Sequence, residues 1–333
     1  MGAVLVTGGA GYIGSHIVRR LVEDRRDVIV LDDLSEGHRA AVCDGATFVE
    51  GDCGSERLLG DLLAGGRVSW IVHMAASSLV GESVEDPAKY YANNVSRGLA
   101  LLDASRRAGV LGIVFSSTAA VYGDPADLPI TEEQPAAPTN PYGETKICFE
   151  RALGWYHRAY GIRYVALRYF NAAGAHPSGE IGEDHAPETH LIPRLLGALL
   201  RGGPPVPIFG EDYPTADGTC IRDYVHVADL AEAHVAALAA LAAERVDAGA
   251  FNLGNGEGFS VREVVDMVSR VTGSLPPTTR APRRPGDPAI LVASSARAAK
   301  RLGYRPSIPR LEDIVGTAWR WHREHPEGYG DRR

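Results

Sequence analysis

A glycine-rich turn between an apolar run and a helical pattern constrains this chain more than any other feature of its sequence. Residues 3–6 are apolar and include two β-branched valines, which is typical of a short buried strand. The turn at residues 7–14 reads TGGAGYIG, and apolar side chains recur with helical spacing over residues 12–23. A strand, a glycine turn and a helix in this order predict a dinucleotide-binding turn, in which the helix N-terminus faces a pyrophosphate.

The three glycines of this turn have distinct expected roles. Gly8 can take the tight turn, Gly11 lets the backbone approach the pyrophosphate, and Gly14 lets the helix pack close to the strand. Their spacing is G-x-x-G-x-x-G rather than G-x-G-x-x-G, so the glycines alone are a weak signal. A second apolar run, residues 27–31, ends at Asp32, whose carboxylate can accept hydrogen bonds from both hydroxyls of an adenosine ribose. Since this carboxylate would repel a 2′-phosphate, we expect the cofactor to be NAD rather than NADP.

The composition argues against several classes of function. A chain of 333 residues can hold one large or two modest domains, and a net charge of −8 offers no basic surface for nucleic acid. The four cysteines form no C-x-x-C pair, so neither a zinc site nor a redox motif is expected, and we predict no metal site. No apolar stretch approaches the length of a membrane span, and the first strand begins too early to leave room for a signal peptide. We therefore expect a cytoplasmic protein without a membrane or nucleic-acid partner.

Apolar runs alternate with helical patterns through the first half of the chain. Further strands are expected at residues 46–50, 68–74 and 112–116, and one long helix over residues 86–108. This alternation predicts an α/β fold with a Rossmann-type, doubly wound parallel sheet. After the third strand, Asp52 could cap the next helix or hydrogen-bond the adenine amino group, and the sequence leaves both open.

A candidate catalytic group follows the fifth strand. Hydroxyl side chains end that strand at Thr118, and a later helix is expected to begin at Pro141. This start places Tyr142 and Lys146 one turn apart on the same face. Tyrosine has a reference pKa of about 10, but the lysine ammonium and the positive nicotinamide of NAD would favour the phenolate and lower that pKa. The threonine hydroxyl could hold the hydroxyl of a substrate and pass on its proton.

Longer stretches of the chain resemble a known family. They include NPYGETK, LRYFNAAGAHPSGEIGED, FGEDYPTADGTCIRDYVHVADLA, FNLGNGEGFSV and APRRPGDPA. The chain is similar to the extended short-chain dehydrogenase/reductase superfamily and, over nearly its whole length, to its UDP-glucose 4-epimerase (UDP-galactose 4-epimerase) family. The resemblance implies a retained NAD, with Tyr142 as phenolate taking the proton of the sugar 4-hydroxyl while the C4 hydride moves to NAD. The 4-keto sugar then turns over and takes the hydride back on its other face. C4 of UDP-galactose or UDP-glucose is thereby inverted, in galactose metabolism.

The resemblance also implies roles for individual residues. Thr118 takes the hydroxyl role beside Tyr142, and Lys146 contacts the nicotinamide ribose. Arg222 and Arg284 suit a diphosphate, because guanidinium presents a fork of donors to phosphate oxygens. Besides Gly8, Gly11, Gly14, Asp32 and Lys146, the implied cofactor positions are Tyr12, Ile13, Asp33, Leu34, Asp52, Cys53, Met74, Ala75, Ala76, Asn94 and Phe170. The implied substrate positions are Ser117, Thr118, Tyr142, Asn171, His190, Leu191, Phe209, Arg222, Arg284, Asp287 and Leu291.

Three residues depart from the family pattern. Ser78 stands where well-known members carry a lysine near the NAD phosphates, which removes a charge and would weaken cofactor retention. Thr118 replaces the more usual serine, keeping the hydroxyl while stiffening χ1. Leu291 stands where some bacterial members have a tyrosine in the sugar pocket. A smaller residue there would make room for an N-acetyl group, so we hypothesise that UDP-GlcNAc and UDP-GalNAc are also accepted.

The second half of the chain reads as a smaller lobe. We expect residues 1–170 to form the NAD-binding Rossmann domain, to which a later strand and helix return, and residues 171–333 to form mainly a UDP-sugar-binding α/β lobe. In that lobe a helix over residues 260–272 has a capping-box pattern. The family resemblance implies a homodimer, in which residues 92–108 and 141–160 could pair as a four-helix bundle.

Several alternatives have to be weighed against an epimerase of UDP-glucose. A 4,6-dehydratase needs an acidic group beside the threonine for elimination, whereas Ala119 and Ala120 follow Thr118 here. A 4-epimerase of UDP-glucuronate or UDP-pentoses uses the same C4 chemistry and is harder to exclude. A non-catalytic NAD-sensing protein would not need Tyr142, Lys146 and the hydroxyl together.

Overall fold

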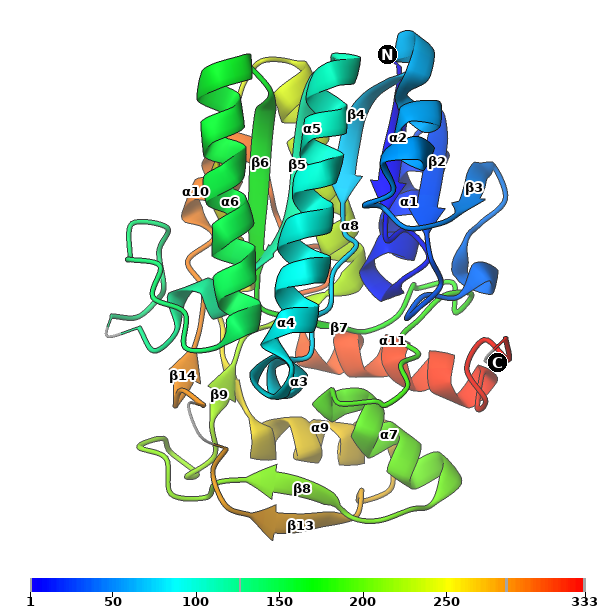
Figure 1. The fold of residues 1–333 in the computed structure, drawn as a ribbon. Helices are drawn as coiled ribbons and strands as arrows, with labels where there is room; N and C mark the ends of the chain where they lie inside the picture. The colour runs from blue at the N-terminus through cyan, green and yellow to red at the C-terminus, as the bar shows by residue number, and fades with distance from the viewer. Residues whose placement is uncertain (1, 126, 285–286, 332–333) are drawn as a thin grey trace.

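A seven-stranded parallel sheet forms the centre of the computed structural model, which describes residues 2–125, 127–284 and 287–331 (Figure 1). The strand order is β11-β6-β5-β4-β1-β2-β3, so the order reverses between β1 and β4. Ligands of doubly wound sheets bind at this reversal, beyond the carboxyl ends of the strands. The predicted fold class is confirmed. The strands are β1 Ala3–Thr7, β2 Val28–Asp32, β3 Ala46–Glu50, β4 Val68–His73, β5 Gly112–Thr118, β6 Arg163–Tyr169 and β11 Ala248–Leu253.

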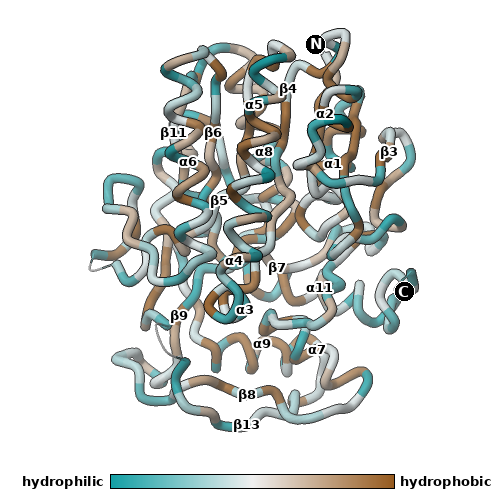
Figure 2. Tube along the Cα trace, viewed as in Figure 1, coloured by the Kyte–Doolittle hydropathy of each residue, from teal (hydrophilic) through white to brown (hydrophobic). Residues whose placement is uncertain are grey.

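Helices cover both faces of this sheet, because successive side chains of each strand point to opposite sides. Val4 and Val6 of β1 join the core under α1 (Tyr12–Glu23), α8 (Val227–Ala242) and α10 (Ala296–Leu302). Leu5 joins the opposite core, under α2 (Glu56–Leu63), α5 (Gly98–Ala108) and α6 (Pro141–Tyr160). The strands are accordingly brown in Figure 2, and the outer helices alternate between brown and teal.

One predicted element has a different form in the structure. The sequence suggested one continuous helix over residues 86–108, but the chain forms α3 (Val80–Glu85), α4 (Pro87–Tyr90), a π-helix at Tyr91–Arg97 and then α5. The π-helix holds Asn94, which is 4% exposed and whose side chain bonds the loop after β4. Single π turns are often found at functional sites, since they redirect a side chain within a helix.

A smaller lobe lies below the carboxyl edge of the sheet in Figure 1. Its own core packs α7 (Leu191–Arg201), α9 (Val261–Thr272) and α11 (Leu311–Glu324) with β8 (Val206–Phe209), which pairs with β13 (Thr278–Ala281). The expected capping box is present on α9, between Ser260 and Glu263. Short strands link this lobe to the sheet: β7 Asn171–Ala173, β9 Ile221–Arg222, β10 Tyr224–His226, β12 Phe259–Ser260 and β14 Ile290–Leu291. Among the described residues, no helix has the length and apolar character needed to cross a bilayer.

Candidate active site

A cavity of about 490 Å³ opens at the carboxyl ends of β1, β2 and β4, where the strand order reverses. Eight of the predicted cofactor residues line it, together with small residues of the loop after β4 and two basic residues of the neighbouring helices, Lys89 and Arg97. A site of this size and position suits an extended, charged ligand. The eight are Gly8, Gly11, Asp32, Asp33, Cys53, Met74, Ala75 and Ala76.

The three glycines of the turn are needed for different reasons. A side chain on Gly8, which has a φ of +70°, would lie 2.5 Å from the amide nitrogen of Ala75. One on Gly14 would lie 2.0 Å from the Gly8 carbonyl oxygen, so both glycines are needed by the fold itself. Gly11 differs, because its φ of −76° suits any residue and its nearest neighbour would be 3.5 Å away. Its missing side chain keeps open the N-terminus of α1, which faces the cavity.

The carboxylate of Asp32 lies 7% exposed at the end of β2. Its two oxygens accept hydrogen bonds from the backbone amides of Ala10 and Leu34, both at 2.9 Å, which orients the group toward the cavity. Burial raises its pKa, and these hydrogen bonds oppose the rise. With Asp33 and Glu36 also on the cavity wall, this end of the site carries negative charge that disfavours a phosphate.

Asp52 does not cap the next helix, which was one of its two expected roles. Ser55 is the N-cap of α2, and its side chain accepts a hydrogen bond from Leu58. The carboxylate of Asp52 accepts a hydrogen bond from Gly54 and pairs with Arg97 at 3.2 Å. Because a residue three positions later provides the cap, the Asp52 carboxylate is left to pair with Arg97, which lines the cavity.

Asn94 holds the loop that follows β4. Its side-chain oxygen accepts from the Ser77 amide at 2.8 Å, and its amide group donates to the Ser77 carbonyl at 3.0 Å and to Thr145 at 3.1 Å. Both backbone groups of Ser77 are therefore satisfied by one side chain. This fixes the path of the cavity-lining segment and ties it to α6.

Tyr142 and Lys146 begin α6, as the proline-led helix start predicted. The Lys146 ammonium lies 5.7 Å from the centre of the Tyr142 ring and donates to the Ser116 carbonyl at 2.9 Å. Burial lowers the pKa of Lys146 to about 7. Burial raises the pKa of Tyr142 to about 12, and a hydrogen bond with Thr118 lowers it in part.

The expected lowering of the Tyr142 pKa depends on the positive nicotinamide of NAD, and the protein groups by themselves do not produce it. The loss of water around the phenol outweighs the local charges, and the lysine faces the Ser116 carbonyl rather than the phenol oxygen. A further positive charge in the cavity is needed to stabilise the phenolate.

Ser117 does not reach the cavity, which corrects its expected role as a substrate contact. It has no exposed surface, and its hydroxyl donates to Glu150 of α6 at 2.5 Å. Glu150 also accepts two hydrogen bonds from Arg168 of β6, at 2.6 and 3.0 Å. Side chains of a strand alternate in direction, so Thr118 faces Tyr142 while Ser117 enters this buried ion pair.

The predicted diphosphate residues gather in the smaller lobe. Arg222 is 8% exposed and pairs with Asp287 at 2.5 Å, and Arg284 pairs with the same carboxylate at 3.0 Å. The Arg284 guanidinium lies 4.9 Å from the centre of the Phe209 ring. Leu291 of β14 pairs in register with Arg222 and packs against the apolar cluster that contains Phe170. Two arginines, an aromatic ring and an apolar surface therefore lie close together in the smaller lobe.

Other predicted residues contribute mainly through their backbone. The Tyr12 hydroxyl donates to the Gly174 carbonyl at 2.6 Å, leaving Tyr12 and Ile13 to offer backbone groups at the start of α1. Leu34 has a φ of +57° and bonds Asp32. The backbone amide of Asn171, the first residue of β7, donates a hydrogen bond to the Asp223 carbonyl oxygen. His190 and Leu191 lie at the N-terminus of α7.

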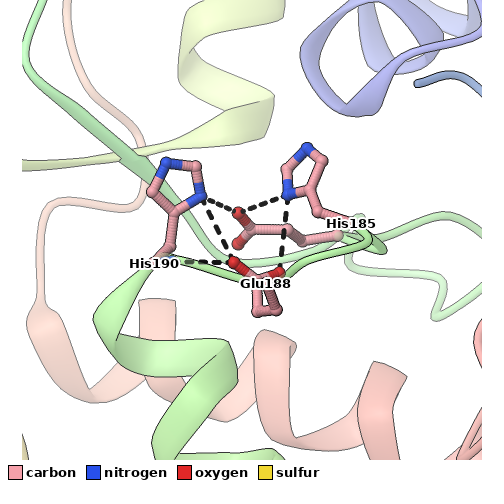
Figure 3. A group of neighbouring side chains, drawn as sticks. His185, Glu188 and His190 are labelled. Atoms are coloured by element: carbon pink, nitrogen blue, oxygen red, sulfur yellow. Dashed lines mark hydrogen bonds and ion pairs between the residues drawn. The ribbon is translucent and has the colours of Figure 1, made fainter. Parts of the chain in front are cut away.

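Sequence reasoning missed the surroundings of His190. Its ring contacts Glu183, and Glu188 and His185 lie beside them, so four potential metal ligands meet within 4.8 Å (Figure 3). The residues are close in the sequence, but their spacing matches no common metal motif. Glu150 and Arg168 were missed for another reason, since nothing in their local sequence shows that α6 and β6 bring them together.

Comparison with known proteins places the chain in a family. Residues 4–254 match the model of the NAD dependent epimerase/dehydratase family. The chain belongs to this family.

Several relatives named UDP-glucose 4-epimerase match almost the whole chain. A UDP-glucose 4-epimerase of Halalkalibacterium halodurans is 54% identical over 327 residues, which cover 98% of this chain and 97% of that protein. A UDP-glucose 4-epimerase of Lacticaseibacillus casei is 49% identical over 333 residues, 99% of each. Among solved structures, UDP-glucose 4-epimerase from Bifidobacterium longum in complex with NAD⁺ and UDP is 37% identical, with a TM-score of 0.92, and covers 98% of this chain and 99% of that one.

Proposed function

We propose that this family member inverts C4 of UDP-galactose and UDP-glucose through a transient 4-keto sugar, with NAD as its cofactor. The observation that carries the proposal is the meeting of Tyr142, Thr118 and Lys146 at the carboxyl end of β5, the strand next to β4 in the sheet. These three groups supply a base, a hydroxyl that relays or orients a proton, and a nearby cation. Full-length similarity to proteins named UDP-glucose 4-epimerase supports the same reaction.

The glycine at position 11 indicates that the cavity fits NAD. Gly11 has no conformational or packing need to be glycine, and a side chain there would fill the space above the N-terminus of α1. The N–H groups of that helix end suit a pyrophosphate, and Asp32 suits the adenosine ribose hydroxyls. When bound, NAD supplies a reversible acceptor for the hydride of C4 and a positive nicotinamide ring.

Each catalytic group then has one task. Tyr142 accepts the proton of the sugar 4-hydroxyl and later returns it, which requires the phenolate. Thr118 stabilises this phenolate through the hydrogen bond that lowers the Tyr142 pKa. Lys146 is held by the Ser116 carbonyl, from where it can bind the nicotinamide ribose and add positive charge. Lys146 stays within reach of Tyr142, since both lie on one face of α6.

The smaller lobe binds the nucleotide part of the substrate. Arg222 and Arg284 present guanidinium groups to the diphosphate, and Asp287 keeps them together until the substrate enters. Phe209 offers an aromatic surface to the uracil. Binding energy taken from UDP leaves the sugar free to turn between its two hydride transfers.

The division into domains, the compartment and the assembly are parts of the same proposal. Residues 1–170 with α8 and β11 would carry the cofactor, and the rest of residues 171–333 would carry the UDP-sugar. Four free cysteines support a reducing compartment, the cytoplasm. Exposed apolar residues on the outer helices, including Leu99 and Trp155, support a homodimer.

The test is to mix the purified chain with UDP-galactose, without added NAD, and follow UDP-glucose by NMR. Conversion without added cofactor supports a retained NAD in spite of Ser78. Conversion that requires added NAD keeps the reaction but makes binding of the cofactor reversible. If UDP-galactose remains unchanged with NAD present, the proposed reaction is wrong, and conversion of UDP-glucuronate or a UDP-pentose would then favour a 4-epimerase of that sugar.

Tyr142→Phe is the matched control for this experiment, since it removes one oxygen and keeps the ring. We expect a loss of at least about 10²-fold in kcat, the usual lower bound for a positioned acid–base group. Its circular dichroism spectrum and NAD content should equal those of the wild type. Undiminished conversion by this variant would remove Tyr142 from the mechanism.

A further inference from the structure

Two histidines and two glutamates meet in the segment that leads into α7. Glu183 is 4% exposed, and His185, Glu188 and His190 follow it within seven residues. Each offers one ligand atom, and all four atoms lie within 4.8 Å of one another. In Figure 3 the rings of His185 and His190 point toward the carboxylates from opposite sides. The cluster contains none of the catalytic groups described above, and only His190 among its residues is a predicted substrate position.

We propose that this cluster is a zinc site. Zinc prefers four ligands in a tetrahedron, with nitrogen or carboxylate oxygen at about 2.0–2.2 Å. Such bond lengths place neighbouring ligand atoms about 3.3–3.6 Å apart. The separations from His185 Nδ1 to Glu183 and to Glu188 are both 3.4 Å, and that from His190 Nδ1 to Glu188 is 3.7 Å. The two separations from His185 thus already have the length of tetrahedral edges, whereas His190 faces the other oxygen of Glu188 and lies slightly farther from it.

The contact between His190 and Glu183 shows what binding has to change. His190 Nδ1 lies 2.5 Å from Glu183, joined by a hydrogen bond. Zinc binds neutral imidazole and ionised carboxylate, so the proton between these two atoms leaves when the ion enters. Their separation then lengthens by about 1 Å to reach the same tetrahedral edge. A rotation of the His190 ring suffices, because its side chain is half-exposed.

The ligand types favour zinc over other common cations. Calcium and magnesium take six or more oxygen ligands, whereas half of this set is nitrogen. Imidazole suits zinc, and four protein ligands would complete its shell without an open position. The ion is therefore structural and takes no part in the hydride or proton transfers.

The position of the cluster indicates which segments of the chain the ion would hold together. The backbone carbonyl of Glu183 accepts from the Trp321 indole of α11 at 3.2 Å, and Gly182 bonds the Tyr329 hydroxyl at 3.0 Å. The His185 ring lies 6.1 Å from the ring of Tyr12, which begins α1. Zinc at this point would fix the start of α7 against the C-terminal helix and the cofactor turn.

Binding is tested with the tag-free full-length chain after treatment with a chelator. Zinc chloride is titrated by calorimetry, and bound metal is counted after gel filtration. We expect one zinc for each chain and a rise in Tm. Glu188→Gln, which keeps the shape of the side chain, and His185→Gln should each weaken binding by at least about 10²-fold. His157→Gln, on α6 and beside Asp247, is the matched control and should bind as the wild type does.

Cobalt in place of zinc separates this site from adventitious binding to the cysteines. A tetrahedral nitrogen and oxygen site gives visible d–d bands without the near-ultraviolet band of a thiolate ligand. A thiolate band, or equal binding by wild type and Glu188→Gln, would overturn the proposal. If both variants fold poorly, carbethoxylation of the wild type decides. Zinc should protect His185 and His190 from the reagent, and unchanged labelling would overturn the proposal.

Discussion

At the scale of single residues, Leu291 bears on which sugars the site accepts. It is half-buried on β14, in register with Arg222 and packed on the cluster that contains Phe170. A tyrosine there would occupy more of the space beside the sugar. We expect Leu291→Tyr to lower kcat/KM for UDP-GlcNAc by about 10–200-fold while leaving UDP-glucose nearly unchanged. Both substrates are compared by NMR. Failure of the wild type to turn over UDP-GlcNAc would remove the basis of this prediction.

Thr118 controls the proton affinity of Tyr142, so its removal should change the pH dependence of the reaction. The hydrogen bond lowers the Tyr142 pKa, against a larger rise caused by burial. Without it the pKa rises, and the phenolate forms only at higher pH. For Thr118→Val we expect kcat at pH 7 to fall by about 10²-fold and the rising limb of the pH profile to move to higher pH. Thr118→Ser keeps the hydroxyl and should restore the wild-type profile. An unshifted limb in the valine variant would contradict this role.

The sequence predicted those residues whose constraints are local. Gly14 meets backbone atoms of Gly8 and Gly9 in the same turn, and Asp32 follows directly from the end of its strand. The position of Ser117 was not predictable, because only the packing of β5 against β6 and α6 shows which hydroxyl bonds Glu150 and which bonds Tyr142. The direction of the Tyr142 pKa also needed the structure, since burial decides it.

At the scale of elements, the π-helix couples the cofactor loop to α6 through one side chain. Asn94→Ala leaves the amide and carbonyl of Ser77 without their partner, which costs about 1–3 kcal/mol of the free energy of unfolding. Because the loop lines the cavity, we also expect faster release of NAD. Asn93→Ala is the comparison variant: Asn93 also lines the cavity, but it bonds Ser77 only through the hydroxyl and leaves the backbone groups of Ser77 with their partner. Urea unfolding and the rate of NAD release measure the two effects. Equal behaviour of both variants would contradict the coupling.

The inner strands of the sheet were predictable because β1, β2, β4 and β5 are buried on both faces and read as apolar runs. The π-helix was not, because it depends on the reach of Asn94 to Ser77, in a different element. The smaller lobe escaped detailed prediction for another reason. Strands such as β9 and β14 have two residues each, too few for an alternating pattern to be seen.

At the scale of the whole molecule, the proposed homodimer would cover the outer face of α5 and α6, which lie side by side in Figure 1. Leu99 and Trp155 are 37% and 66% exposed there, more apolar surface than a lone chain needs. We expect Trp155→Glu to raise the dimer dissociation constant by about 30-fold or more, the effect of losing a central aromatic anchor. Sedimentation equilibrium measures it. Leu275→Glu, at a 73% exposed residue of the smaller lobe, should change nothing. A monomeric wild type would rule out the homodimer, and dissociation by both variants alike would place the interface elsewhere.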